Sequence, residues 1–275
     1  MKFRQFTRAG AKFNEDSCYI CKDFGFVIDG ATGLTNCNIT NGKTEAQWFS
    51  CKFKEYLIDS LKDTTKSLSK IVEQGIVEID NEYNKFAGSD NSKIKPSAAI
   101  AIFRLSGLGM EYFVLGDCSI IVNIDDKINI ITSRDLEKFD NQSKQILKAV
   151  ATENNINVID AVPLVENVLI KQRLLKNTVN GYWILSDDAK AVSYAICGTI
   201  TSKIKQIVVV SDGFSQVYEL FEFMTAEELL KELNLTKNIA KIYKKLYKIQ
   251  KKDRFCNNFP RFKVRDDATL IEMLL

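Results

Sequence analysis

Three aspartates stand where a divalent metal ion could be bound. Asp29 ends one apolar run, Asp212 ends another, and Asp266 precedes a β-rich segment near the C-terminus. Carboxylate oxygens are the ligands that Mg²⁺ and Mn²⁺ prefer. The chain has no histidine, so the commonest zinc ligand and the commonest general base are both missing. These residue types therefore indicate hard-metal chemistry without an imidazole.

Further carboxylates lie at other predicted strand ends. Glu15 and Asp16 precede the first strand signal, and Asp117 follows Gly116. Each alone is typical of a surface turn, because Asp-Gly and Gly-Asp are common turn dipeptides. A cluster of these ionised carboxylates would be unfavourable, because two unit charges about 4 Å apart repel by roughly 4 kcal/mol at an effective dielectric of about 20. A cluster is therefore expected only around a cation.

The elements that must position these residues follow from hydrophobic periodicity. Strands are expected over 17–22, 24–29, 182–185, 207–210 and 264–273, and four β-rich runs over 98–105, 110–115, 119–124 and 127–132 predict an antiparallel meander. Helices are expected over 44–61, 61–83, 134–154, 225–233 and 237–252. The first would have a buried face that includes Phe53 and Leu57, and the fourth would begin with a capping box of Thr225 and Glu228. A polar loop is expected over 88–92. Strands grouped with strands favour an α+β fold with antiparallel sheets, and neither GxGxxG nor a P-loop occurs.

Composition narrows the function classes. The 275 residues carry 38 basic and 35 acidic side chains, a balance that argues against a nucleic-acid partner. The lysines of 241–252 are expected to form the solvated face of an amphipathic helix. The alternative is that they bind nucleic acid or an anionic membrane. Long linkers are absent, which predicts one domain over 1–275.

The cellular compartment of the protein is inferred from its cysteines and its hydropathy pattern. Seven cysteines are an odd number, and the CxxC pair Cys18 and Cys21 lies in a predicted strand. We expect buried free thiols there, in preference to a zinc or thioredoxin-like site. No run approaches the ~18–20 apolar residues of a membrane helix, and the N-terminus has no signal-peptide pattern. We therefore expect a soluble cytoplasmic protein without a membrane partner.

Five short motifs occur in a fixed order along the chain. They are Asn14-Glu15-Asp16, Asp29-Gly30-Ala31-Thr32-Gly33, Leu115-Gly116-Asp117-Cys118, Ser211-Asp212-Gly213-Phe214 and Arg265-Asp266-Asp267-Ala268-Thr269. Together they resemble the motifs of the metal-dependent Ser/Thr protein phosphatase 2C family in its bacterial form. The resemblance implies a four-layer α-β-β-α sandwich, with two antiparallel β-sheets flanked by helices and a centre of two Mn²⁺ or Mg²⁺ ions at one end.

The resemblance also implies a role for each motif. Asp29 would bridge two metal ions, the Gly30 carbonyl would be a further ligand, and Asp212 and Asp266 would be terminal ligands. A water or hydroxide between the metals would attack phosphorus in line, without a phospho-enzyme. This chemistry needs no histidine.

The remaining motif carboxylates would act at the edge of the centre. Glu15 and Asp16 would hold metal-bound waters, and Asp117 with Asp212 would form a weaker third metal site. These roles are implied by the resemblance alone.

Three positions depart from the family pattern. Ala31 stands where many eukaryotic members have histidine, and Ala11 stands where an arginine usually grips the phosphate. Arg8 or Lys12 is expected to replace that arginine, although lysine offers a point charge and no bidentate fork. Asp267 stands where asparagine is usual, and it would either tighten metal binding or face solvent.

The sequence thus predicts a Mn²⁺- or Mg²⁺-dependent phosphatase that dephosphorylates proteins in signalling and acts as a monomer. A non-catalytic phosphatase-like scaffold protein is the first alternative, motivated by Ala11. A phosphatase for small phosphate esters is the second, because it would use the same chemistry.

Overall fold

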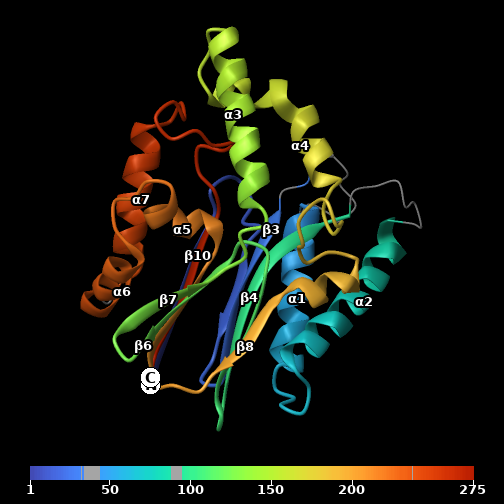
Figure 1. Ribbon diagram of the computed structural model, residues 1–275, viewed down its shortest axis with the longest axis vertical. Coiled ribbons are helices and arrows are strands. Elements are labelled where there is room, and N and C mark those ends of the chain that lie inside the picture. Colours follow the sequence, from blue (N-terminus) through green and yellow to red (C-terminus); the bar gives the residue numbers. More distant parts are fainter. Residues whose placement is uncertain (32, 34–43, 88–94, 237) are drawn as a thin grey trace.

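Two antiparallel sheets face each other and helices cover both outer faces (Figure 1). The computed structural model describes residues 1–31, 33, 44–87, 95–236 and 238–275. The first sheet has the order β1-β10-β9-β6-β7 and the second has the order β2-β3-β4-β5-β8. This arrangement confirms the predicted α+β sandwich.

The strands of each sheet come from distant parts of the sequence. The first sheet consists of β1 (Lys2–Arg8), β10 (Ala268–Leu274), β9 (Ile204–Val210), β6 (Ser119–Ile124) and β7 (Lys127–Ile131). The second consists of β2 (Ser17–Ile20), β3 (Phe24–Ala31), β4 (Ser97–Ser106), β5 (Gly109–Leu115) and β8 (Ile196–Ile200). Every pairing within the two sheets is antiparallel.

Side chains that alternate between the two faces of each strand contribute to three separate hydrophobic layers. Val27 and Ile120 point into the space between the sheets, where they join one buried cluster. Their neighbours Ile28 and Ile121 point outward to different helical layers. Because side chains alternate faces along a strand, runs that are apolar at every position fill both sides of a sheet. The strands that end at the carboxylates are therefore held from both faces.

Helices pack on each outer face. α1 (Glu45–Ser60) and α2 (Leu68–Ala87) cover the second sheet, and α5 (Asp212–Glu219), α6 (Ala226–Leu235) and α7 (Ala240–Lys252) cover the first. A smaller cluster joins α3 (Glu137–Glu153), the 3₁₀ helix η1 (Ile159–Val165) and Cys256. α4 (Glu166–Arg173) follows η1 directly, and η2 (Ala189–Tyr194) precedes β8. Figure 1 shows α3 and α4 beyond one end of the sheets.

Helix caps and stripes fall where the sequence predicts them. The Thr44 side chain accepts the Gln47 N–H at the start of α1, and α6 begins with the capping box of Thr225 and Glu228. The predicted inner stripe of α1, which includes Phe53 and Leu57, is buried. On α7, Ile242 and Leu246 are buried, while its lysines are exposed. The amphipathic reading of both helices is therefore confirmed.

Several expected boundaries are wrong. The second helix begins at Leu68 and not at 61, because Asp63 accepts the Thr65 N–H in a turn and Ser67 accepts the Lys70 N–H at the new start. The closing strand begins at Ala268, later than expected. Residues 182–185 form only isolated bridges and no strand. β1 and β8 were not predicted, since exposed positions dominate both.

The predicted meander is also wrong. β4 pairs with β5 and β6 pairs with β7, but the two hairpins belong to different sheets. The chain crosses between sheets at Gly116, whose φ of 87° suits glycine. The predicted loop at 88–92 lies outside the described residues.

The other structural expectations concern thiols and the membrane. Cys18 is a buried free thiol, as expected. Cys21 is also a free thiol, but it is half-buried and follows the end of β2. None of the described helices is long and apolar enough to span a membrane.

Candidate metal centre

The predicted carboxylates converge at one end of the two sheets. Asp29 lies near the end of β3, whereas Asp212 begins α5 directly after β9, in the other sheet. The backbone N–H of Asp212 donates to Asp29 Oδ2 at 3.3 Å, which joins the two sheets at this point. The start of α5 is tied to β10 because Ser211 and Thr269 exchange two hydrogen bonds, of 3.0 and 3.1 Å.

The pKa values show that these carboxyls resist ionising together. Burial raises the pKa of Asp29 well above its usual range, and the charges of Asp212 and Asp16 raise it further. Burial, followed by the charge of Asp266, raises the pKa of Asp212 to about 6. Burial and then Asp212 also raise the pKa of Asp117, which lies between β5 and β6. Each carboxyl is thus part of one electrostatic group.

Asp16 gives the clearest sign that a cation belongs here. Its side chain is buried, and neither carboxylate oxygen makes a well-formed hydrogen bond to any described residue. Burial raises its pKa to about 8, although the nearby hydroxyls of Thr269 and Ser211 act in the opposite direction. A buried carboxylate is rarely left without a partner unless an ion or water completes it.

The donor set fits a hard divalent cation. All the converging groups offer carboxylate oxygens, which Mg²⁺ and Mn²⁺ accept. Within the described residues, however, no three acidic or thiol side chains lie close enough to form a ready-made metal site. The structure therefore holds the carboxylates as a convergent group and not as a complete coordination sphere.

Two glycines allow the backbone segments of the site to meet. A Cβ at Gly30 would lie 2.6 Å from the Glu15 carbonyl oxygen, and one at Gly213 would lie 1.9 Å from the Asp267 carbonyl oxygen. Both distances are shorter than real side chains tolerate. The glycines after Asp29 and Asp212 thus bring β3 against the Glu15 segment and α5 against the start of β10.

Asp267 does not face solvent, and its charge adds to the effect of burial in raising the pKa of Asp16. It is buried, and its two carboxylate oxygens accept the backbone N–H groups of Gly10 at 2.7 Å and Glu15 at 2.6 Å. Asp267 therefore fixes the N-terminal segment that carries Glu15 and Asp16.

Two acidic residues near the group escaped sequence reasoning. Burial raises the pKa of Asp140 on α3, and its charge raises the pKa values of Asp117 and Asp212. Glu219 on α5 also raises the pKa of Asp117. The only signal for Asp140 was its i,i+4 spacing to Lys144, which is typical of an exposed helix pair. Its place beside the sheets depends on how α3 packs.

Lys263 reaches the carboxylates, and it also escaped sequence reasoning. Lys263 Nζ donates to Asp266 Oδ1 at 2.8 Å. Of the two cations expected from the sequence, Lys12 is exposed with its Nζ 5.0 Å from the ring centroid of Phe13. Arg8 is exposed at the end of β1. Burial raises the pKa of Tyr243 on α7, and the charge of Arg8 offsets part of this effect. Phosphate binding by Arg8 or Lys12 stays a prediction.

Comparison with known proteins identifies the family. The family model described as Protein phosphatase 2C matches residues 8–246, and the chain belongs to this family of metal-dependent protein phosphatases. The match ends before Asp266. No curated protein sequence matches the chain.

Solved structures agree in fold at low sequence identity. The serine/threonine phosphatase PstP/Ppp of Mycobacterium tuberculosis is 14% identical, with 100% of this chain and 98% of that chain covered and a TM-score of 0.56. Stp1 of Staphylococcus aureus is 12% identical, with coverage of 100% and 94% and a TM-score of 0.57. The catalytic domain of PstP in complex with two manganese ions is 13% identical, with coverage of 98% and 96% and a TM-score of 0.56.

Proposed function

We propose that this chain is an active Mn²⁺- or Mg²⁺-dependent phosphatase that hydrolyses phosphoserine or phosphothreonine in proteins. Family membership supports the reaction class. The observation that carries the proposal is the convergence of Asp29, Asp212 and Asp16 from both sheets. Burial and then the charges of Asp212 and Asp16 raise the pKa of Asp29, and the charge of Asp212 also acts on Asp16. In its fully ionised form such a group needs a compensating cation.

The carboxylates divide naturally between the two sheets. Asp29 would lie between two ions with the Gly30 carbonyl beside it, and Asp212 and Asp266 would hold one ion from the other sheet. When bound, the ions supply an activated water as nucleophile and neutralise charge on the phosphoryl oxygens. The protein's own part is to hold the ligands and orient the phosphate. Because the chain has no histidine, the leaving group would take its proton from water or from another group.

The other acidic residues would act at the edge of this centre. Glu15 and Asp16 would contact the second ion through water, on the segment that Asp267 fixes. Asp117 and Asp212 would form a third, weaker site that Asp140 faces from α3.

The first test is metal-dependent turnover by the purified chain. We expect hydrolysis of p-nitrophenyl phosphate and of a phosphothreonine peptide with Mn²⁺, and loss of both with EDTA. Asp29→Asn should lower kcat/KM by about 100-fold or more, because it removes a charge shared by the ions. Asp59→Asn, at an exposed position on α1, is the matched control and should leave kcat/KM unchanged.

The alternatives give different outcomes in the same assay. A scaffold protein, which the absent arginine at Ala11 favours, would bind phosphopeptide without turnover at any Mn²⁺ concentration, and that result would overturn the proposal. A small-ester phosphatase would turn over sugar phosphates faster than phosphopeptides.

Compartment and assembly are part of the proposal. The described cysteines are all free thiols, which supports a reducing cytoplasm. We propose a monomer whose macromolecular partner is the phosphoprotein substrate.

A further inference from the structure

Lys263 places a positive charge within the carboxylate group. Its side chain is 41% exposed, so it can be reached from solvent, and it donates to Asp266. Partial burial lowers the pKa of Lys263, but the charges of Asp266, Asp212 and Glu15 outweigh this effect and raise the pKa overall. The ammonium therefore stays charged at neutral pH.

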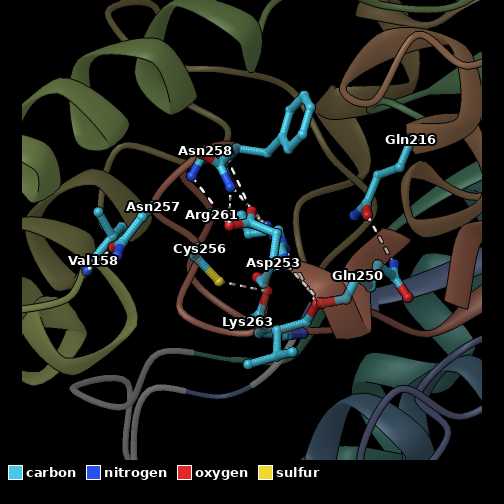
Figure 2. Close-up of polar contacts among 11 residues, drawn as sticks. Val158, Gln216, Gln250, Asp253, Cys256, Asn257, Asn258, Arg261 and Lys263 are labelled. Carbon is cyan, nitrogen blue, oxygen red and sulfur yellow. Dashed lines mark hydrogen bonds and ion pairs between the residues drawn. The ribbon is translucent and has the colours of Figure 1, made fainter. Parts of the chain in front are cut away.

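A buried ion pair fixes the loop that carries Lys263 (Figure 2). Arg261 and Asp253 have side chains 6% exposed, and Arg261 Nη1 donates to Asp253 Oδ2 at 2.7 Å. The guanidinium also donates to the backbone carbonyls of Gln250, Asp253, Phe259 and Val264. The Asp253 carboxylate in turn accepts the N–H groups of Asn258 and Phe259, each at 3.1 Å. The loop between α7 and β10 is thus cross-linked internally.

Contacts outside the loop fix its position in the molecule. The Gln250 side chain donates to Gln216 on α5 at 3.1 Å, and Asn257 accepts the Val158 N–H at 3.0 Å (Figure 2). The loop is therefore attached directly to the start of η1 through Asn257. It is attached indirectly to the helix that begins with Asp212, because Arg261 donates to the Gln250 carbonyl at the end of α7. Lys263 lies between the fixed Arg261 and the site residue Asp266, so little backbone freedom is lost when its ammonium meets a ligand.

We propose that Lys263 binds a phosphoryl oxygen of the substrate, an inference that rests on the proposed phosphatase function. A lysine ammonium has three N–H donors, so it can contact Asp266 and a phosphate oxygen together. Lys144 and Arg173 are also near the carboxylates, and they act on Asp140. Lys263 would thus orient the phosphate at the rim of the metal centre, on the side of Asp266.

The test compares Lys263→Met and Lys263→Arg with the unmodified chain. Calorimetry of the Mn²⁺-loaded protein measures the Kd of inorganic phosphate, and a separate Mn²⁺ titration measures metal affinity. We expect Lys263→Met to weaken phosphate binding about 10- to 100-fold, the effect of one hydrogen bond to a charged group. In Lys263→Met, KM for p-nitrophenyl phosphate should rise while Mn²⁺ affinity does not fall. In Lys263→Arg, the Kd of phosphate should stay within about 3-fold of its value in the unmodified chain.

Control variants separate a local effect from loss of charge in general. Lys248→Met changes an exposed lysine of α7, and it should alter neither the Kd of phosphate nor the KM for p-nitrophenyl phosphate. Lys263→Gln is a second neutral variant should Lys263→Met fail to fold. Arg8→Met and Lys12→Met test the residues expected from the sequence, and a larger loss of phosphate affinity in either would overturn the inference.

The remaining outcomes distinguish the inference from the proposed function. If Lys263→Met binds Mn²⁺ more tightly and phosphate equally well, Lys263 is only a counter-ion and the inference fails alone. If the unmodified chain shows no turnover, the proposed function fails. Loss of phosphate affinity in Lys263→Met would then still support Lys263 as a phosphate ligand.

Discussion

Asp266 and Asp267 are neighbours in the chain, yet their carboxylates have different roles. Asp266 faces Lys263 and raises the pKa of Asp212, so it belongs to the charged group. Asp267 accepts two backbone N–H groups and so holds the N-terminal segment. A candidate metal ligand and a structural carboxylate thus lie one position apart in the chain.

Replacement of Asp267 by alanine is expected to destabilise the protein. The N–H groups of Gly10 and Glu15 would lose their acceptors, and the free energy of unfolding should fall by about 2–4 kcal/mol. Asp267→Asn should cost less, because one amide oxygen can still accept. Urea unfolding in EDTA measures both, so that metal binding does not contribute. Asp23→Ala, at an exposed turn, is the control, and an equal loss there would contradict the assigned role.

At the scale of elements, sequence reasoning succeeded where a segment carries its own signal. The cap and stripe of α1 and the capping box of α6 are local, so both helices were predicted. β1 was missed because most of its residues are exposed. The crossing at Gly116 was read as a hairpin turn, because Gly-Asp suits either and only packing decides between them.

The candidate site divides in the same way. Asp29 and Asp212 end apolar runs, so their sequence context marks them. Lys263 and Asp140 lie in a loop and on a helix, and no local pattern distinguishes them from surface charges. Their position beside the carboxylates follows from the Arg261 ion pair and from the packing of α3, which depend on residues far apart in the chain.

The Arg261–Asp253 ion pair offers a prediction for the whole loop. Arg261→Met leaves Asp253 buried without its counter-charge, and the free energy of unfolding should fall by about 3–5 kcal/mol. Adding Asp253→Asn should recover part of that loss, since the unpaired charge disappears. Chemical unfolding of the two single variants and the double variant measures this coupling.

The same variants test whether the loop positions Lys263. With the loop loosened, KM for p-nitrophenyl phosphate should rise in Arg261→Met even under conditions where the protein is folded. An additive double variant with unchanged KM would contradict both the coupling and the positioning role.

At the scale of the whole molecule, the carboxylate group lies where the two sheets meet. Asp29 belongs to the second sheet, whereas Asp212 and Asp266 adjoin strands of the first. Their mutual repulsion therefore acts between the two halves of the sandwich. A cation bound by both halves would turn this repulsion into attraction across the sheets.

This geometry predicts how stability depends on pH in the metal-free protein. The folded-state pKa values of Asp16, about 8, and Asp212, about 6, exceed the value of about 4 for an unfolded aspartate. Between about pH 4 and about pH 8 the folded chain therefore binds more protons than the unfolded chain, and stability must fall as pH rises. Lys176, whose pKa burial lowers to about 8, has the opposite effect only above this window.

Thermal unfolding from about pH 5 to about pH 8, with EDTA or with Mn²⁺, measures this dependence. In EDTA we expect Tm to fall across the range. The gain from Mn²⁺ should grow with pH, because the ligands must lose their protons before they bind metal. Asp212→Asn removes one of these charges, so it should flatten the EDTA profile and reduce the gain from Mn²⁺. A Tm that rises with pH in EDTA and does not respond to Mn²⁺ would show that the carboxylates do not act as one group across the two sheets.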